Sequence, residues 1–280
     1  MQHAKTLDFV GARRRVLKII KYRKSLINVL GEFPLFAPSS AGSYKAKAPL
    51  TILGVNSIVP LLHLLTETVG GRDLNVKSTH ELISSRLDLQ EKASSLKEIF
   101  NQNGTEKPNP LYALYTHILE QPENVKHICE IGIGTNNSDV VSTMGRNGVP
   151  GASLRAFRDY CPNALIVGGD VDPRIMFKEN RIQTIVVDQT DIFGFQEALN
   201  STTLEFDLLI DDGLHSPNAN LASLIVGLSV IKRGGWIVIE DIPERGLIFW
   251  RLVANLLPES YQVSIFHSTS PGYIFTVQKL

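Results

Sequence analysis

The residues best suited to catalysis stand in two short phrases in the second half of the chain. The first, D-D-G-L-H, brings Asp211, Asp212 and His215 together, and the second, E-D, holds Glu240 and Asp241. Several carboxylates in one place repel one another unless protons or a cation neutralise them. Oxygen ligands in this number suit Mg²⁺, Ca²⁺ or Mn²⁺ better than zinc, and the histidine can act as a base or as a further ligand. The alternative is an Asp pair that caps a helix beside a surface histidine.

Three earlier apolar runs end in residues that suit a nucleotide-like ligand. The first ends in E-I-G-I-G, where Gly132 and Gly134 let the backbone approach a ligand closely, and the next two end at Asp170 and Asp188. A carboxylate at the second strand suits a ribose diol, and one at the third can accept a hydrogen bond from an adenine amino group. Each acid alone could be a turn residue, but acids on successive strand ends favour a ligand site.

The glycine phrase differs from a dinucleotide-binding fingerprint. Asn137 stands where the third glycine would be, and residues 135–150 are loop-like, with the next helix starting near Ser153. A pyrophosphate site places a helix N-terminus directly behind the glycines. The sequence therefore predicts a ligand with a ribose and a charged tail but no diphosphate.

Both groups of residues depend on a sheet that brings strand ends together. From residue 127 onward, short apolar runs alternate with helical stretches, which predicts βαβ units and a doubly wound, mostly parallel sheet of the α/β class. The last two runs are close enough in sequence to form a hairpin, so the sheet is expected to end with an antiparallel strand. The seven predicted strands are HICEIGI, LIVGGDV, IQTIVVD, FDLLIDD, GGWIVIEDI, YQVSIFH and GYIFTVQ.

Residues 1–118 are predicted to be a helical N-terminal region and residues 119–280 the catalytic core. The first 50 residues contain ten Lys or Arg and two acids, and their basic cluster alternates with apolar residues as in an amphipathic helix. A helical lid over an open cofactor cleft is the simplest role for this region, and docking of its basic helix on a partner or an anionic surface is the alternative. A loop is predicted over residues 33–47, and helices over residues 13–24, 52–69, 78–101 and 111–119.

Composition narrows the class of protein. The chain has 280 residues, with 28 Lys+Arg against 28 Asp+Glu, so it lacks the basic excess of a protein that coats nucleic acid. Cys129 and Cys161 are too few for a disulfide scaffold, and buried thiols in a cytoplasmic protein are expected. The stretch over residues 221–231 is identified as the most apolar and is too short to cross a membrane, so no membrane span is predicted. A homo-oligomer is left open.

The stretch from Cys129 to Trp250 resembles the class I S-adenosylmethionine-dependent methyltransferases, which have a Rossmann-like core. Within them it is similar to the metal-dependent sugar O-methyltransferases of the macrocin and mycinamicin type. The combination of D-Q-T-D, D-D-G-L-H and I-E-D carries most of the specificity. The shared phrases are E-I-G-I-G, P-G-A-S-L-R-A-F-R-D-Y-C-P-N-A, G-G-D-V-D, V-D-Q-T-D, F-D-L-L-I-D-D-G-L-H and G-G-W-I-V-I-E-D.

This resemblance implies roles for individual residues. It implies S-adenosylmethionine as cofactor and a divalent metal, with Mg²⁺ expected and Mn²⁺ or Fe²⁺ as alternatives. It implies His215 as the base, beside Asp212. The implied metal ligands are Asp212, Glu240 and Asp241. The implied cofactor-binding residues are Glu130, Gly132, Gly134, Ser153, Asp170, Asp188 and Asp211.

Two phrases depart from the sugar enzymes. Residues 104–112 stand where those enzymes carry an S-D-K phrase and a His-rich stretch, and they contain no histidine. Residues 242–245 replace a Ser-Tyr-Trp phrase. Because both stretches fall where acceptor contacts are expected, a macrolide sugar is not assigned as the acceptor.

The resulting prediction is metal-assisted methyl transfer from S-adenosylmethionine to a hydroxyl of a small-molecule acceptor, natural-product or sugar-like. A bound cation would lower the pKa of the hydroxyl, and His215 would take its proton. One alternative is C-methylation next to a carbonyl of a polyketide-like substrate, which could be activated in the same way. The others are a methyltransferase-like module that only binds its ligand, and a dehydrogenase, which the missing third glycine disfavours.

Overall fold

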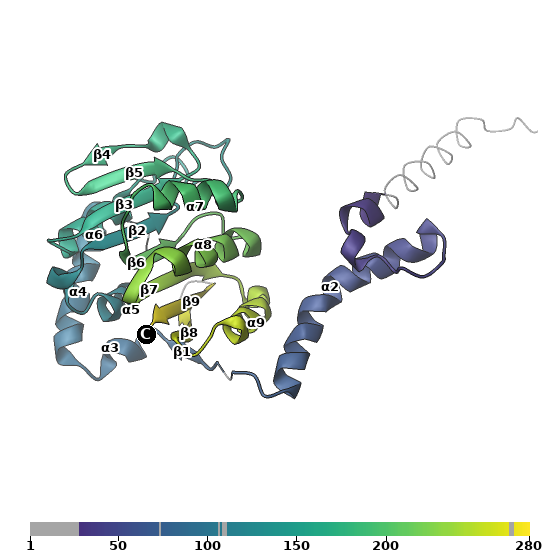
Figure 1. Ribbon diagram of the computed structural model, residues 1–280. Helices are drawn as coiled ribbons and strands as arrows, with labels where there is room; N and C mark the ends of the chain where they lie inside the picture. The colour runs from purple at the N-terminus through teal and green to yellow at the C-terminus, as the bar shows by residue number, and fades with distance from the viewer. Residues whose placement is uncertain (1–27, 73, 106, 108–110, 269–271) are drawn as a thin grey trace, which may run out of the picture. The chain divides into compact units, whose positions relative to one another are not determined.

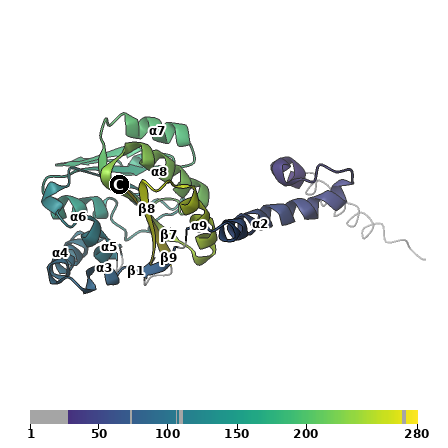
Figure 2. The ribbon, with the colours of Figure 1, turned by 60° about the horizontal axis from the view of Figure 1, so that its bottom comes forward.

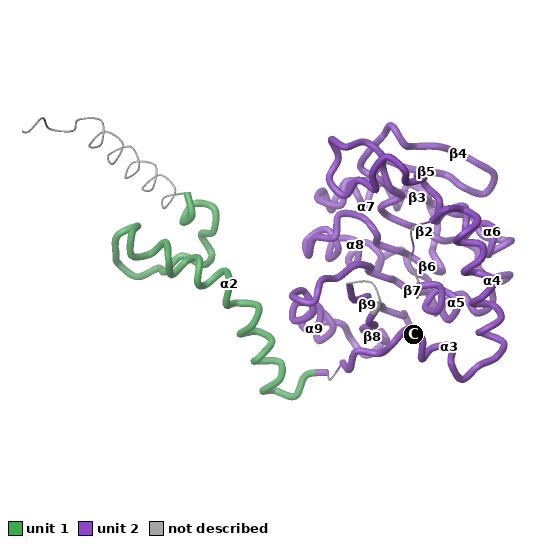
Figure 3. Tube along the Cα trace, turned by 180° about the vertical axis from the view of Figure 1, so that it is seen from behind, with its two compact units in different colours: residues 1–71 green, residues 72–280 purple. Residues whose placement is uncertain are grey.

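The computed structural model describes residues 28–72, 74–105, 107, 111–268 and 272–280. The chain divides into two compact units, residues 1–71 and 72–280, which Figure 3 colours separately. The boundary thus falls after residue 71, not after the residue 118 that the sequence predicts. The basic cluster predicted as a helix over residues 13–24 lies outside the described residues.

The larger unit is built on one sheet, which has nine strands within the described residues (Figure 1). The strand order is β1-β8-β9-β7-β6-β2-β3-β5-β4. Parallel pairs join β5, β3, β2, β6 and β7 in that order, while β9 runs antiparallel to both β7 and β8. The strands are β1 (Val76–Ser78), β2 (His127–Ile131), β3 (Leu165–Asp170), β4 (Lys178–Glu179), β5 (Ile182–Val186), β6 (Phe206–Asp211), β7 (Ile231–Ile242), β8 (Tyr261–Ser268) and β9 (Gly272–Lys279).

This arrangement confirms the predicted α/β class, the mostly parallel sheet and the closing hairpin. The seven predicted strands are β2, β3 and β5 to β9. The two additional strands, β1 and β4, lie at the two edges and have only three and two residues. Strands this short are held by backbone pairing and leave no apolar run in the sequence.

Helices cover both faces of the sheet, as Figure 2 shows. On one face α4, α5 and α6 pack over a buried cluster that contains Ile128 and Ile166, and on the other α7, α8 and α9 cover a cluster that contains Cys129 and Val167. Successive strand residues thus enter opposite cores, as the period of two requires. The helices are α3 (Glu81–Ser84), α4 (Leu87–Asn103), α5 (Leu111–Ile118), α6 (Ala152–Tyr160), α7 (Ile192–Asn200), α8 (Pro217–Val230) and α9 (Leu247–Leu256), with one-turn 3₁₀ helices at Pro122–Asn124, Pro173–Ile175 and Glu244–Gly246.

Helices α4 and α5 explain why the core unit begins before residue 118. Phe100 of α4, Tyr115 of α5 and Phe157 of α6 are all buried in one cluster. The ring centroids of Phe100 and Phe157 lie 5.6 Å apart, and those of Tyr115 and Phe157 lie 5.1 Å apart, both edge to face. Aromatic pairs of this kind bury large apolar areas. These helices are therefore part of the core itself.

The order in which successive strands join the sheet reverses at β2, in the centre of the sheet. Strand β2 pairs with β3 on one side and with β6 on the other, both in parallel. In open α/β sheets, ligands bind outside the carboxyl ends of the strands at such a switch point. The segment between β2 and α6 has no helix or strand over residues 132–151, as predicted for this loop.

The smaller unit contains one long helix, α2 (Tyr44–Thr68), after a 3₁₀ turn at Pro34–Phe36. It begins earlier than the helix predicted over residues 52–69, because the Ser43 hydroxyl caps it by accepting a hydrogen bond from the backbone N–H of Ala46. By length and composition alone, α2 is the one described helix that could cross a membrane. The stretch over residues 221–231, expected to be the most apolar, lies almost entirely in the shorter helix α8.

Candidate active site

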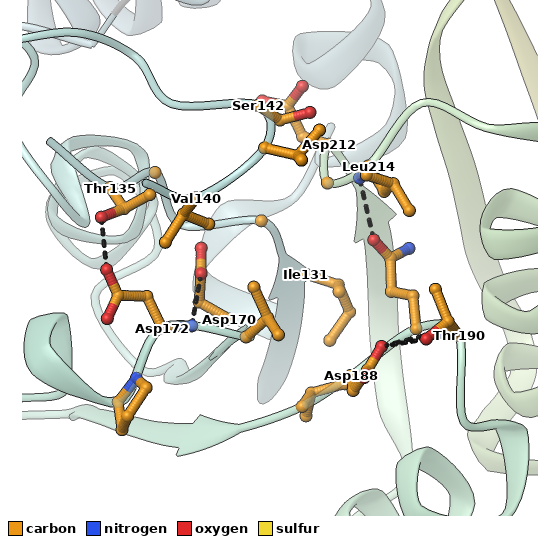
Figure 4. Close-up of a pocket in the computed structure, with 18 of the residues that line it drawn as sticks. Ile131, Thr135, Val140, Ser142, Asp170, Asp172, Asp188, Thr190, Asp212 and Leu214 are labelled. Atoms are coloured by element: carbon orange, nitrogen blue, oxygen red, sulfur yellow. Dashed lines mark hydrogen bonds between the residues drawn. The ribbon is translucent and has the colours of Figure 1, made fainter. Parts of the chain in front are cut away.

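A cavity of about 530 Å³ opens at the carboxyl ends of β2, β3, β5 and β6 (Figure 4). Residues from all four strand ends line it, so the sheet brings together the groups that the sequence places far apart. Among the predicted cofactor residues, Gly132, Gly134, Asp170 and Asp188 line this cavity, and Asp212 borders it as well.

The glycines of this edge have different roles. Gly132 has a φ of +89°, and a Cβ there would lie 2.2 Å from the carbonyl oxygen of Asp212, so only glycine fits. Gly134 has a φ of +82° and faces the Met144 side chain. Gly168 and Gly169 of β3 pack against core side chains such as Leu154 and Ile131. Because side chains alternate along a strand, these two positions face the two opposite cores rather than the cavity.

Two acids at the end of β3, Asp170 and Asp172, border the cavity, and Asp172 is bonded to the loop that follows β2. The Asp170 carboxylate accepts a hydrogen bond from the backbone N–H of Asp172 at 3.0 Å, and burial raises its pKa. The Asp172 carboxylate accepts from Thr135 Oγ1 at 2.6 Å and from Arg174 Nε at 2.7 Å. The Arg174 guanidinium, followed by the Thr135 hydroxyl, holds the pKa of Asp172 well below its usual range. Two carboxylates with different environments thus line the place predicted for the ribose.

The third strand end is joined to the fourth through a glutamine. Asp188 is on the cavity surface and accepts hydrogen bonds from the backbone and hydroxyl of Thr190. Gln189 donates to Asp211 at 2.8 Å and accepts from the backbone N–H of Leu214 at 3.0 Å. Asp211 is fully buried, and burial raises its pKa to about 6. It does not line the cavity, and its predicted contact with the cofactor stays a prediction.

A second cavity of about 310 Å³ lies beside the first. The two cavities share four wall residues, which are Gly132, Gly134, Ser142 and Asp212. Ser153, His215, Glu240 and Asp241 line only the second cavity. The predicted catalytic rim therefore forms the wall of a separate space that adjoins the predicted cofactor space.

Two residues of this rim have strained backbones. His215 has a φ of +52° and Asp241 a φ of +54°, in the left-handed region that non-glycine residues rarely adopt. His215 Nε2 lies 3.9 Å from Asp212 Oδ1 and 3.9 Å from Asp241 Oδ2. Its buried Nδ1 has no hydrogen-bond partner among the described residues. Strain of this kind collects at functional sites because the surrounding structure must hold it.

A buried lysine that the sequence analysis did not select lies between the predicted ligands. Lys107 has a side chain only 3% exposed, and its Nζ lies 3.0 Å from Glu130 Oε1, 3.0 Å from Asp212 Oδ2 and 2.7 Å from Glu240 Oε1. Glu240 also accepts a hydrogen bond from the Tyr115 hydroxyl. Glu130 accepts a hydrogen bond from Ser153 at 2.5 Å, is fully buried and lines neither cavity. Its predicted contact with the cofactor stays a prediction.

Burial and crowding shift the pKa values of this cluster. Burial raises the pKa of Glu240 to about 8 even though Lys107 acts in the opposite direction. Burial and then the neighbouring Asp212 charge raise the pKa of Asp241. Burial disfavours the Lys107 ammonium, but Asp212, Glu130 and Glu240 outweigh it and raise its pKa well above the usual value. The lysine is therefore a permanent charge at this site.

The residues of the rim fit a divalent cation, and the predicted ligands Asp212, Glu240 and Asp241 all line the second cavity. Asp212, His215 and Asp241 each offer one ligand atom, and these atoms all lie within 4.8 Å of one another. A carboxylate and imidazole set of this kind suits Mg²⁺ or Mn²⁺. Glu240 instead faces Lys107 and Tyr115. His215 could be a third ligand or, through Nε2, which lies 3.9 Å from both carboxylates, a base beside the cation.

Lys107 gave little signal in the sequence. It stands in a connection between two helices, and one lysine in a polar stretch has no periodicity to mark it. Residues 104–112, which contain Lys107, stand where the sugar enzymes carry an S-D-K phrase, and the resemblance implies no role for this lysine. Tyr115 resembled an ordinary core residue of a helix, and its hydroxyl partner comes from a strand 125 residues further along the chain.

Comparisons with known proteins agree with the motifs. A scan against family models finds no match. The chain is 34% identical over 135 residues to a tetracenomycin-pathway rhamnosyl 3'-O-methyltransferase of Streptomyces olivaceus, covering 48% of this chain and 31% of that protein. It is 31% identical over 126 residues to demethylmacrocin O-methyltransferase of Streptomyces fradiae, covering 45% of this chain and 30% of that protein. The matched part is thus about a third of each relative's length.

Solved structures give the same fold. The MycE methyltransferase of the mycinamycin pathway, in complex with Mg, SAH and mycinamycin VI, has a TM-score of 0.53 at 22% identity, covering 66% of this chain and 53% of that one. A crystal form with Mg and SAH has a TM-score of 0.50 at 21% identity, covering 66% and 54% of the two chains. The larger unit thus has the fold of a Rossmann-like methyltransferase. The predicted resemblance to the macrocin- and mycinamicin-type enzymes is confirmed.

Proposed function

We propose that this chain transfers a methyl group from S-adenosylmethionine to a hydroxyl of a small natural-product or sugar-like acceptor, with help from a divalent cation. The observation that carries the proposal is the pair of adjoining cavities. One is lined by the glycine and acid strand ends that suit the donor, the other by the carboxylate and histidine rim, and they meet at Gly132, Gly134 and Asp212. The relatives named above are O-methyltransferases, which supports the same reaction.

The chain's own residues then have defined tasks. When bound, S-adenosylmethionine supplies an activated methyl group and the cation supplies positive charge that lowers the pKa of a hydroxyl. Asp212 and Asp241 would hold the cation, and His215 would take the proton at Nε2, which faces both carboxylates. Met144, Val149 and Ile133 give the second cavity an apolar wall against water. Alignment of donor and acceptor supplies the remaining rate enhancement.

Three features of the proposal concern the whole protein. We propose that residues 1–71 limit access to the cleft, as a lid, because a class I core leaves one rim open to water. We propose that the chain has no nucleic-acid partner, since Lys+Arg and Asp+Glu are equal at 28 each. We also propose a cytoplasmic location, which the free buried cysteines Cys129 and Cys161 favour. We propose a small-molecule acceptor whose reacting hydroxyl enters the second cavity.

Turnover assays test the proposal directly. Purified chain would be incubated with S-adenosylmethionine carrying a labelled methyl group and with rhamnosylated or other glycosylated polyketides as acceptors. The proposal predicts labelled product with at least one acceptor, with the labelled methyl group attached to oxygen as NMR identifies it, and no product after chelation. A product labelled on carbon would support the C-methyltransferase alternative, and tight cofactor binding with no turnover on any acceptor would support a binding module.

A further inference from the structure

The long helix of the smaller unit, α2, exposes large apolar side chains along most of its length. Residues 48–66 contain no Lys, Arg, Asp or Glu, and only Ala48 and Thr51 of the helix are buried within the part of the chain that the structure describes. The exposed large apolar residues of the helix are Leu50, Ile52, Leu53, Ile58, Leu61, Leu62, Leu64 and Leu65. An exposed apolar surface of this extent marks a site of interaction.

The apolar side chains of α2 point to opposite sides of the helix. Leu50 and Val59 are nine residues apart, and so are Leu53 and Leu62, a separation of two and a half turns. None of the buried apolar clusters of described residues includes a residue of α2. A helix that packs on one partner helix buries a single stripe, whereas a helix that is apolar on most sides belongs in a protein core or in a membrane. A lipid bilayer covers this surface better than one partner helix does.

The hydroxyl groups of α2 are satisfied within the helix itself. Thr51, Ser57, Thr66 and Thr68 each donate a hydrogen bond to a backbone carbonyl about one turn earlier, at 2.7–3.0 Å. Polar groups that enter the apolar part of a bilayer must find such partners, because no water is present there to supply them. These side chains therefore do not hinder insertion into lipid.

The remaining polar side chains in the second half of α2 follow one narrow line. Asn56, His63 and Glu67 are seven and four residues apart, so they lie on the same side of the helix. His63 Nε2 lies 3.4 Å from Glu67 Oε1. A helix with one polar line can lie lengthwise in a bilayer surface, with that line towards water.

The charge of the preceding residues determines which kind of bilayer fits. The first 50 residues contain ten Lys or Arg against two acids, and Lys45 and Lys47 stand in the first turn of α2. Such a segment is attracted to anionic lipid headgroups. Basic flanks stay on the cytoplasmic side of a membrane, and the larger unit is proposed above to be cytoplasmic. Both flanks of α2 then stay on one side, so the helix does not cross.

We propose that α2 inserts lengthwise into the surface layer of an anionic lipid bilayer, with the basic residues before it bound to lipid phosphates. The larger unit would then act at the cytoplasmic surface of a membrane. This inference goes beyond the proposed function, and it holds whether or not residues 1–71 also shield the cleft.

Flotation of the full chain with lipid vesicles tests the proposal. Phosphatidylcholine vesicles with about 30% phosphatidylglycerol should bind the chain about tenfold more tightly than phosphatidylcholine alone. Leu61→Glu combined with Leu65→Glu should weaken this binding by about tenfold or more, since these side chains are 57% and 55% exposed and a charge among acyl chains is costly. Leu87→Glu combined with Leu256→Glu, at exposed leucines of α4 and α9, is the matched control and should bind as the unchanged chain does.

A second pair of substitutions separates electrostatic attraction from insertion. Lys45→Glu combined with Lys47→Glu should weaken binding to the anionic vesicles by about threefold or more. Binding of the same variant to phosphatidylcholine alone should equal that of the unchanged chain, because the apolar surface is intact. Equal binding of this variant and the unchanged chain to the anionic vesicles would contradict the role of the basic flank.

Three results would overturn the inference. The first is no binding to the anionic vesicles, or equal binding by the unchanged chain and by the Leu61→Glu, Leu65→Glu chain. The second is self-association in sedimentation velocity without lipid that is lost in that variant while no vesicles are bound, which would assign the apolar surface to a second copy of the chain. The third is protection of either flank of α2 from protease added to inside-out membrane vesicles of expressing cells, since a helix that does not cross leaves both flanks open to cleavage.

Discussion

On the β2–β5 side of the carboxyl edge, acids are held by groups from the loops that follow the strands, whereas on the β6–β7 side they are held by a lysine that precedes β2. Asp172 is bonded to Thr135 and Arg174, and Asp188 to Thr190. Asp212 and Glu240 face Lys107, and Asp241 faces only His215 at 3.9 Å. The acids of the first side have hydrogen-bond partners within the protein. The second side contains His215 and Asp241 with strained backbones, and the buried Nδ1 of His215 has no partner among the described residues. The first is therefore suited to binding and the second to chemistry.

Removal of the metal should have the largest effect on turnover. This effect should be confined to the β6–β7 side and should leave cofactor binding on the β2–β5 side intact. Excess EDTA should abolish methyl transfer, and Mg²⁺ or Mn²⁺ should restore it. The Asp212 and Asp241 carboxylates need a cation to lie close together, and the cation activates the hydroxyl. Affinity for S-adenosylhomocysteine should change by less than about threefold, since the first side has its own partners. Assay with and without chelator, alongside calorimetry, measures both. Full turnover in excess chelator would falsify the metal site.

Removal of the His215 side chain should lower turnover, which depends on the β6–β7 side, and leave cofactor binding on the β2–β5 side unchanged. His215→Ala should lower kcat by about 10²- to 10⁴-fold, the range expected when a general base is removed. The cofactor cavity does not include His215, so cofactor affinity should be kept. His80→Ala, at an exposed histidine before α3, is the control. Equal turnover in His215→Ala and His80→Ala would remove His215 from the mechanism.

Removal of residues 1–71 tests whether the smaller unit contributes to the chemical side. If it shields the cleft, the shortened chain should bind S-adenosylhomocysteine normally but lose about tenfold or more in turnover, because water enters the site. The cut follows the boundary between the two compact units, so the larger unit should keep its melting temperature. Unchanged turnover by the shortened chain would show that residues 1–71 serve docking instead.

Gly134→Val should damage the binding side. A Cβ at Gly134 would lie 2.3 Å from Met144 Cε, so the Met144 side chain must move, and the φ of +82° strains any other residue at this position. We expect cofactor affinity to fall by about tenfold, with about 1–2 kcal/mol of added backbone strain. Gly145→Val is a close control, because Gly145 has a φ of +76° with nothing within 4 Å of its Cβ position. Equal cofactor affinity in both variants would contradict the role of the Met144 contact.

The smallest expected effect concerns pH on the binding side. The pKa of Asp172 is lowered mainly by Arg174. A lowered carboxyl pKa contributes stability above the unfolded value of about 4, and this stability is lost as the pH falls through the folded value. The chain should therefore exceed Arg174→Gln in urea midpoint at pH 6, with the difference shrinking below about pH 4. Arg233→Gln, on an exposed part of β7, should show no such trend, and a constant difference at all pH values would exclude the pairing.

The sequence predicted the strands, their closing hairpin and the residues at their ends, because these features are encoded locally. Apolar runs mark buried strands, and a motif such as D-D-G-L-H keeps its residues within one turn. What it could not predict depends on distant parts of the chain meeting. Lys107 reaches carboxylates 23, 105 and 133 positions away, and the burial of Phe100 and Tyr115 against Phe157 decides that α4 and α5 belong to the core. Glu130, Asp211 and Glu240 were placed on the correct strands, but their partners are protein groups.

Calorimetric titration of the full chain with S-adenosylhomocysteine, and separately with NAD, tests most directly whether the glycine and acid edge is a methyl-donor site. The account predicts one S-adenosylhomocysteine bound per chain, with an affinity unaffected by EDTA and by His215→Ala, and no measurable binding of NAD. Binding of NAD without S-adenosylhomocysteine, or of neither compound, would contradict it.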